Sequence, residues 1–88
     1  MSDKLDRDAP WRLSPEVSLR EEPFGALAYH HGNRRLVFVS SRALVALLER
    51  LGEYRSMNEA LAEVPEGARE RVARALEDLA ASGMLRGA

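Results

Sequence analysis

The feature that most constrains the fold is a predicted β-hairpin over residues 24–40, FGALAYHHGNRRLVFVS. Two runs rich in β-forming residues flank Gly32-Asn33, a dipeptide that tolerates the positive φ of a primed two-residue turn. If that pair is the whole loop, the facing residues are Tyr29 with Leu36 and Leu27 with Phe38. Because side chains alternate along a strand, one face then carries large apolar groups. The opposite face carries smaller ones, namely Ala26, Ala28, Val37 and Val39.

The second strand of this hairpin is apolar on both faces, at Leu36-Val37-Phe38-Val39. A hairpin strand at a sheet edge usually turns one polar face toward water. We therefore expect a helix of the same chain, a partner, or both to cover this strand.

Size and composition predict one small globular domain, because the chain has 88 residues of which 45% are hydrophobic and 31% charged. The absence of cysteine excludes disulfides and thiolate metal sites. Thirteen basic and fourteen acidic residues give a net charge of −1, so no overall field favours nucleic acid. No stretch has the apolar core of a signal peptide or reaches membrane-spanning length. We expect a cytoplasmic protein that does not contact a membrane.

The start of the chain differs in character from the rest. Residues 1–12 are half charged and poor in apolar groups, which predicts a flexible tail, and residues 13–86 are predicted to form a single domain. Trp11 interrupts the polar tail. It either folds back as a lid on the core or stays exposed as an aromatic anchor for a partner.

The remaining elements follow from local signals. Alternation over residues 16–22 predicts a further strand, joined to the hairpin by a turn at Pro23. A first helix starts at Ser40 or Ser41, and we expect Gly52 to stop it in a left-handed conformation. Ser56 and Glu59 form a capping box for a short second helix.

The last helix is predicted over residues 66–82, ending at Gly83 in a Schellman motif that places Met84 against Leu79. The fold class is therefore α+β. The arrangement is winged helix-turn-helix-like, with a three-stranded antiparallel meander followed by three helices.

No group of residues has the pattern of a catalytic or metal site. His30 and His31 are neighbours in a strand, so their side chains point to opposite faces and cannot chelate one ion. The sequence also lacks a glycine-rich phosphate loop. We expect no enzyme activity and no cofactor.

DNA binding is the main alternative, because winged helices bind DNA and several arginines could contact phosphates. These are Arg34, Arg35, Arg69, Arg71 and Arg74. The predicted second helix, however, carries Glu59 and Glu63 and no basic residue, which suits a DNA major groove poorly. A third possibility is a purely structural subunit of a larger enzyme.

Residues 15–38, PEVSLREEPFGALAYHHGNRRLVF, resemble the mycofactocin-system chaperones, which belong to the PqqD-like peptide-recognition domains. The likeness is most specific at EPFGALAYHHGNRRL and extends loosely to Gly83-Met84-Leu85. The resemblance implies a non-catalytic recognition element that binds the mycofactocin precursor peptide and presents it to a radical S-adenosylmethionine (SAM) maturase. It further implies that the leader of the precursor adds as a strand to the third strand and lies against the last helix.

The residues themselves make strand addition physically reasonable, since the third strand has an unpaired edge and apolar groups on both faces. Each net hydrogen bond contributes about 1 kcal/mol, whereas ordering each peptide residue costs roughly 1–2 kcal/mol, so side-chain anchors are needed. A groove walled by Val72, Ala73 and Leu76 would supply them, although these residues also fit an ordinary core stripe. The predicted peptide-binding residues are Arg35, Leu36, Val37, Phe38, Val39, Arg69, Val72, Ala73 and Leu76. We expect a monomer or a weak homodimer.

Overall fold

The computed structural model of the chain describes residues 6–87. The strands are β1 (Trp11–Leu13), β2 (Val17–Glu22), β3 (Gly25–His30), β4 (Leu36–Val39) and β5 (Leu85–Gly87). The helices are α1 (Arg42–Arg50), α2 (Met57–Leu61) and α3 (Glu66–Ala81), with a short 3-10 turn, η1 (Leu51–Glu53), after α1. The predicted α+β class, with a three-stranded antiparallel meander and three helices, is confirmed.

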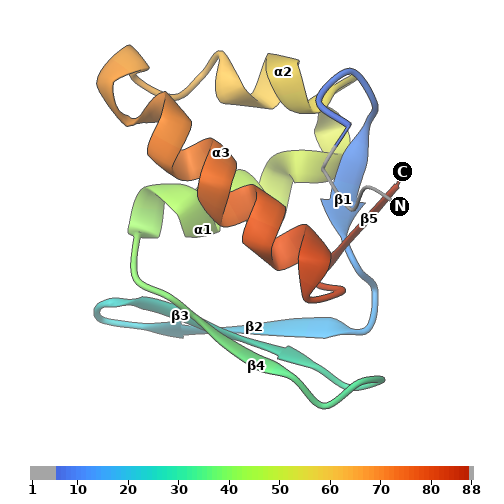
Figure 1. The fold of residues 1–88 in the computed structure, drawn as a ribbon. Helices are drawn as coiled ribbons and strands as arrows, with labels where there is room; N and C mark the ends of the chain where they lie inside the picture. Colours follow the sequence, from blue (N-terminus) through green and yellow to red (C-terminus); the bar gives the residue numbers. More distant parts are fainter. Residues whose placement is uncertain (1–5, 88) are drawn as a thin grey trace.

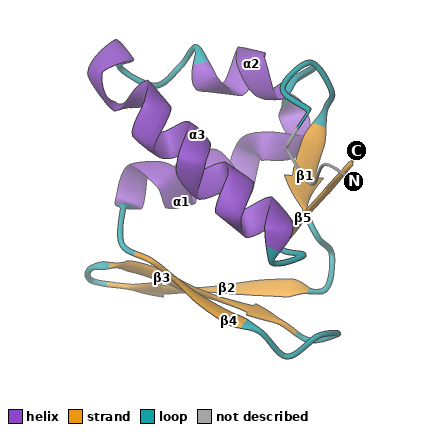
Figure 2. Cartoon of the chain, viewed as in Figure 1, coloured by secondary structure: helices purple, strands orange, loops and turns teal. Residues whose placement is uncertain are grey.

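The chain is arranged in two layers (Figure 1). Strands β2, β3 and β4 form one antiparallel sheet in that order, and the helices lie on one side of it (Figure 2). Strands β1 and β5 pair with each other in a separate two-stranded ribbon beside the helices. None of the helices within residues 6–87 is long and apolar enough to cross a membrane.

The predicted hairpin register is confirmed, since Tyr29 faces Leu36 and Leu27 faces Phe38. The predicted two-residue primed turn is wrong. The ladder closes where the His30 amide donates to the Arg35 carbonyl at 2.9 Å, which leaves a four-residue loop over 31–34. The positive φ falls on Arg34, at 63°, whose amide donates to the His30 carbonyl at 2.8 Å. The predicted two-residue loop and the observed four-residue loop are centred on the same peptide bond, so the strand register is the same for both.

The smaller side chains of the hairpin face the helices. Ala26 and Ala28 are fully buried and Val39 is 3% exposed. The larger side chains of β4 point to the other face, where Leu36 is 61% and Phe38 57% exposed. Helices of the same chain therefore cover only one of the two apolar faces of β4.

The helix ends follow their local signals with one exception. Ser41 caps α1 and Ser56 caps α2, each accepting an amide hydrogen bond through its hydroxyl. At the end of α3, Gly83 has φ of 80° and the Met84 amide donates to the Leu79 carbonyl at 2.9 Å, which confirms the Schellman motif. The prediction for Gly52 is wrong, because it lies inside η1 without a positive φ. The 3-10 turn keeps Leu51, only 1% exposed, in the core.

The predicted flexible tail does not extend over residues 6–12; residues 1–5 lie outside the described part of the chain. Trp11 starts β1, which pairs with β5, and its half-buried ring packs against the core as a lid. The carbonyls of Ala9 and Arg7 accept the amides of Met57 and Asn58, at 3.0 and 2.8 Å. These are first-turn amides of α2, which have no partner within the helix.

Gly25 should be required for the meander. Its φ is +150°, and a Cβ atom built there collides with the Val39 carbonyl oxygen on β4. We expect Gly25→Ala to lower the free energy of unfolding by about 2 kcal/mol or more, measured by chemical denaturation. The matched control is Gly67→Ala in α3, where a Cβ meets nothing within 4 Å; it should be neutral or stabilise by up to about 1 kcal/mol. Equal stability of Gly25→Ala and the parent would contradict this account.

Candidate functional site

A groove of about 720 Å³ runs between strand β4 and helices α1 and α3. Strand β4 contributes Val37, Phe38 and Val39. Helix α3 forms one wall with Ala68, Val72, Ala75 and Leu79, and helix α1 forms the other with Ala43, Leu44, Ala46 and Leu47. The lining is thus mostly apolar, and its volume lies within the range of sites that hold small ligands or side chains.

Short side chains keep the groove open. Ala43 and Ala46 are three residues apart on α1, and Ala68 and Ala75 are seven apart on α3, so each pair lies on one face of its helix. All four line the groove. Methyl groups at these positions cannot fill the space between the two helices, whereas longer side chains would close it.

One long side of the groove is an unpaired strand edge. Among the described residues, β4 pairs only with β3. Because the His30 amide bonds the Arg35 carbonyl, the alternation of an antiparallel ladder turns the backbone groups of residues 35, 37 and 39 toward β3. The amide and carbonyl groups of Leu36 and Phe38 therefore point to the open edge. They can receive the backbone of another extended segment.

Polar side chains lie at the end of the groove near α2. The Tyr54 hydroxyl donates to Glu63 Oε1 at 3.1 Å, and the Arg50 guanidinium lies 5.8 Å from the Tyr54 ring centroid. Arg50 also lies 4.0 Å from the Glu63 carboxylate. Partial burial, followed by the hydrogen bond to Glu63, raises the pKa of Tyr54 above its usual value, so the phenol is a neutral donor. This end carries both charge signs and has no strong preference for a cation or an anion.

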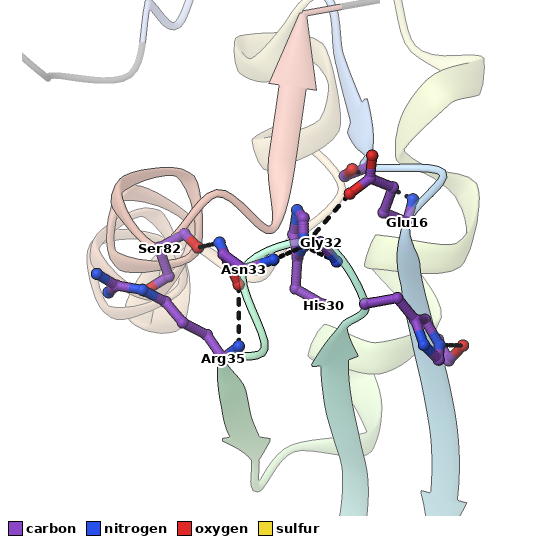
Figure 3. A network of polar contacts seen from close by, with 9 residues as sticks. Glu16, His30, Gly32, Asn33, Arg35 and Ser82 are labelled. Atoms are coloured by element: carbon purple, nitrogen blue, oxygen red, sulfur yellow. Dashed lines mark hydrogen bonds and ion pairs between the residues drawn. The ribbon is translucent and has the colours of Figure 1, made fainter.

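The opposite end is held by a hydrogen-bond network between the hairpin loop and α3 (Figure 3). The Asn33 side-chain amide donates to the carbonyl of Ser82, which also lines the groove, at 3.1 Å. The Asn33 side-chain oxygen accepts the Arg35 amide at 2.9 Å. The start of β4 is thereby tied to the end of α3, and the two walls of the groove keep a fixed spacing there.

His30 supports the same loop from inside. Its Nδ1 atom accepts the amides of Gly32 and Asn33, each at 3.0 Å, and lies 3.7 Å from Glu16 Oε1. His31 instead contacts the Ser18 hydroxyl at 2.8 Å. Within residues 6–87, no group of three or more histidine, cysteine or acidic side chains could hold a metal ion.

The structure brings together some of the predicted site residues. Val37, Phe38, Val39 and Val72 line the groove. Leu36 and Arg35 belong to the same edge segment but do not line the groove, and both are exposed. Six of the nine predicted residues therefore belong to the β4 edge segment or line the groove beside it.

Three predicted site residues lie elsewhere. Ala73 and Leu76 are fully buried in the core, so they do not form a groove wall. Arg69 donates to the carbonyls of Leu61 and Val64, at 3.0 and 2.9 Å, and closes the connection between α2 and α3. Of the predicted α3 wall, Val72 lines the groove but Ala73 and Leu76 do not, because the core stripe and the groove stripe are only one residue apart along the helix.

The sequence prediction did not include the residues of α1 that line the groove, nor Ala68, Ala75 and Leu79 of α3. The available signal was the set of alanines beside the leucine stripes: Ala43, Ala46, Ala68 and Ala75. An alanine at such a position is usually an unremarkable helix former, so the pattern points to a groove only once the two helices are known to face each other.

The chain is similar to known proteins over most of its length. The model of the peptide chaperone MftB family matches residues 10–86. A protein named peptide chaperone MftB from Mycobacterium tuberculosis (strain ATCC 25618 / H37Rv) is 41% identical over 86 residues, which cover 96% of this chain and 79% of that protein. Its namesake from Mycobacterium ulcerans (strain Agy99) is 39% identical over 83 residues, covering 92% and 76%. No solved structure matches the chain.

The Asn33 contact should control the groove end at the hairpin. Asn33→Ala removes both side-chain hydrogen bonds, and we expect it to lower the free energy of unfolding by about 1–2 kcal/mol. Amide hydrogen exchange should accelerate at the hairpin loop and at the last turn of α3. The matched control is Asn58→Ala, which removes a bond to Asp8 on the far side of the molecule. Unchanged exchange at both sites in Asn33→Ala would show that the contact does not hold the loop.

Proposed function

The chain belongs to the peptide chaperone MftB family, and from that premise we propose that it binds the mycofactocin precursor peptide by strand addition and presents it to a radical SAM maturase. The family description is that of a chaperone and not of an enzyme, in agreement with the expectation from the sequence. In this proposal the maturase carries the redox chemistry, and the chain contributes binding and positioning alone.

The single observation that carries the proposal is the unpaired edge of β4 beside an apolar groove. The leader of the precursor would add as a fourth strand and bond the outward backbone groups of Leu36 and Phe38. Backbone bonding of this kind depends little on side chains, so it gives affinity without reading the sequence.

The groove would supply the specificity. In an added strand, side chains on the inner face lie beside Val37 and Val39 and point between β4 and α3. Burying one leucine-sized side chain contributes about 1.5–3 kcal/mol, whereas ordering one residue costs roughly 1–2 kcal/mol. Anchor side chains in the groove therefore help to offset the ordering cost that the backbone hydrogen bonds leave.

The proposed peptide-binding residues are accordingly revised. The segment Arg35, Leu36, Val37, Phe38 and Val39 and the side chain of Val72 are retained from the sequence prediction. Ala75 replaces Ala73 as the low point of the α3 wall, because Ala75 lines the groove. Arg69 and Leu76 act in folding and do not contact the peptide in this proposal.

We rank DNA binding by a winged helix-like fold second. Helix α2 spans Met57–Leu61 and has Glu59 as its sole charged residue. Arg69, one of the arginines considered for phosphate contact, already donates to two backbone carbonyls. We further propose that the protein acts in the cytoplasm, as a monomer or weak homodimer.

The proposal is tested by titrating the chain with synthetic mycofactocin precursor peptide in a calorimeter. We expect saturable binding at one peptide per chain and no change in peptide mass. Adding the maturase and its reductant should then modify the peptide faster with the chain than without it. Absence of binding would refute the proposal, and a saturating, sequence-specific complex with DNA at physiological salt would favour the alternative.

A bulky group in the groove should block the peptide. Ala75 is half-buried and lines the groove, so we expect Ala75→Trp to weaken peptide binding at least about ten-fold by filling the space of an anchor side chain. The matched control is Ala81→Trp, at an exposed position of α3 that does not line the groove. Calorimetry measures affinity, and circular dichroism checks folding. Equal affinity of folded Ala75→Trp and the parent would place the peptide elsewhere.

Proline substitutions on β4 should separate its two edges. Phe38→Pro removes an outward amide and should weaken peptide binding more than Phe38→Ala, which keeps that amide. Val37→Pro removes an amide that bonds β3 and should mainly destabilise the fold, because it breaks a hydrogen bond of the ladder. Affinity is measured by calorimetry and stability by denaturation. If folded Phe38→Pro and Phe38→Ala bind alike, the peptide does not pair with β4.

A further inference from the structure

The outer face of the sheet, which is the face turned away from the helices, has an uneven distribution of apolar groups. On β4, Leu36 is 61% and Phe38 57% exposed. Phe24, 46% exposed, extends this surface, with its ring centroid 4.6 Å from that of Phe38. We call Phe24, Leu36 and Phe38 the outer patch. At the opposite edge, the same face of β2 is polar, with Ser18, Arg20 and Glu22.

On β3, Leu27 and Tyr29 face the same way but are half-buried, so the well-exposed apolar side chains of the outer face lie on β4 and in the turn before β3. The ion pair between Arg20 and Glu22, at 3.0 Å, occupies the β2 side of this face. A globular partner docking flat on the sheet would have to desolvate that ion pair, which is costly. An occupant that lies along β4 would cover Leu36 and Phe38 without reaching that ion pair.

The backbone geometry of β4 indicates that the ligand on this surface is an added strand. Along an antiparallel strand, the direction of the backbone groups and the face of the side chain alternate together. Leu36 and Phe38 therefore point their backbone groups to the open edge and their side chains to the outer face. Ligand residues opposite them in an added antiparallel strand place their side chains on the outer face, about 4.5–5.5 Å from Leu36 and Phe38. The ligand residue between them points into the groove.

We propose that the outer patch is a second side-chain recognition surface for the same peptide, so that the ligand segment has three consecutive apolar residues. The middle residue fills the groove, and its two neighbours cover Leu36 and Phe38. This inference rests on the proposed function, since it requires strand addition at β4. It differs from a groove-only mode, in which only alternate residues of the peptide would need to be apolar.

The test is a serine scan of the synthetic mycofactocin precursor peptide, with affinity measured by calorimetry against the parent chain. We expect three consecutive positions at which serine weakens binding about ten-fold. Against the double variant Leu36→Ser/Phe38→Ser, the outer two positions should lose their effect while the middle one keeps it. The matched control is Arg20→Ser, on the same face of the sheet but on β2, which should leave the whole profile unchanged.

The outcomes separate this inference from the proposed function. Sensitivity at alternate positions only, or parent-like affinity of the double variant, overturns the inference while strand addition stands. Failure of the parent to bind refutes the proposed function itself, whereas parent-like affinity of folded Ala75→Trp places the peptide elsewhere and overturns the inference as well. If the double variant changes a dimer into a monomer in sedimentation without altering peptide affinity, the patch is a contact between copies of the chain and the inference is wrong. The peptide scan against the parent remains decisive if the double variant misfolds.

Discussion

Ala26 and Ala28 lie fully buried on the inner face of β3, and helix α1 packs on this strand. Methyl side chains at these positions let the helical layer approach the sheet closely, and a close-packed core leaves no room for larger groups there. The alternation of the strands then places Leu27 and Tyr29, with their partners Phe38 and Leu36, on the opposite face. One packing constraint thus sets the two-layer architecture and also exposes Leu36 and Phe38, which carry the proposed recognition surface.

The unpaired edge of β4 is a feature that proteins usually have to protect, because an open strand invites pairing with other chains. Here the edge strand is short, at four residues, and follows Arg34 and Arg35, whose charges oppose indiscriminate association. A ligand that adds as a strand needs more than backbone hydrogen bonds to offset the entropy that it loses when it becomes ordered. The groove beside the edge can supply the additional binding energy to a ligand whose side chains fit into it.

Helix α3 is held at both ends and on the flank that does not line the groove. Arg7 lies 3.2 Å from Glu77 and 3.6 Å from Glu70, and the Asn33 amide holds the carbonyl after the last turn. Ion pairs as exposed as these contribute at most about 1 kcal/mol each, so the backbone bonds to α2 do more to fix residues 7–9. The groove flank of α3 is left available because these contacts lie on its other sides.

The sequence by itself determined the features that depend on neighbouring residues: the hairpin register, the caps at Ser41 and Ser56, and the Schellman end at Gly83. These signals are local, since each involves residues within a few positions of one another. The tertiary structure alone decided which alanines of α3 line a groove, because Ala73 and Ala75 are both apolar and only the packed neighbours distinguish core from surface. It also decided the order of residues 6–12, since the groups that bind them lie some 50 to 70 positions away in the chain and leave no local pattern in the sequence.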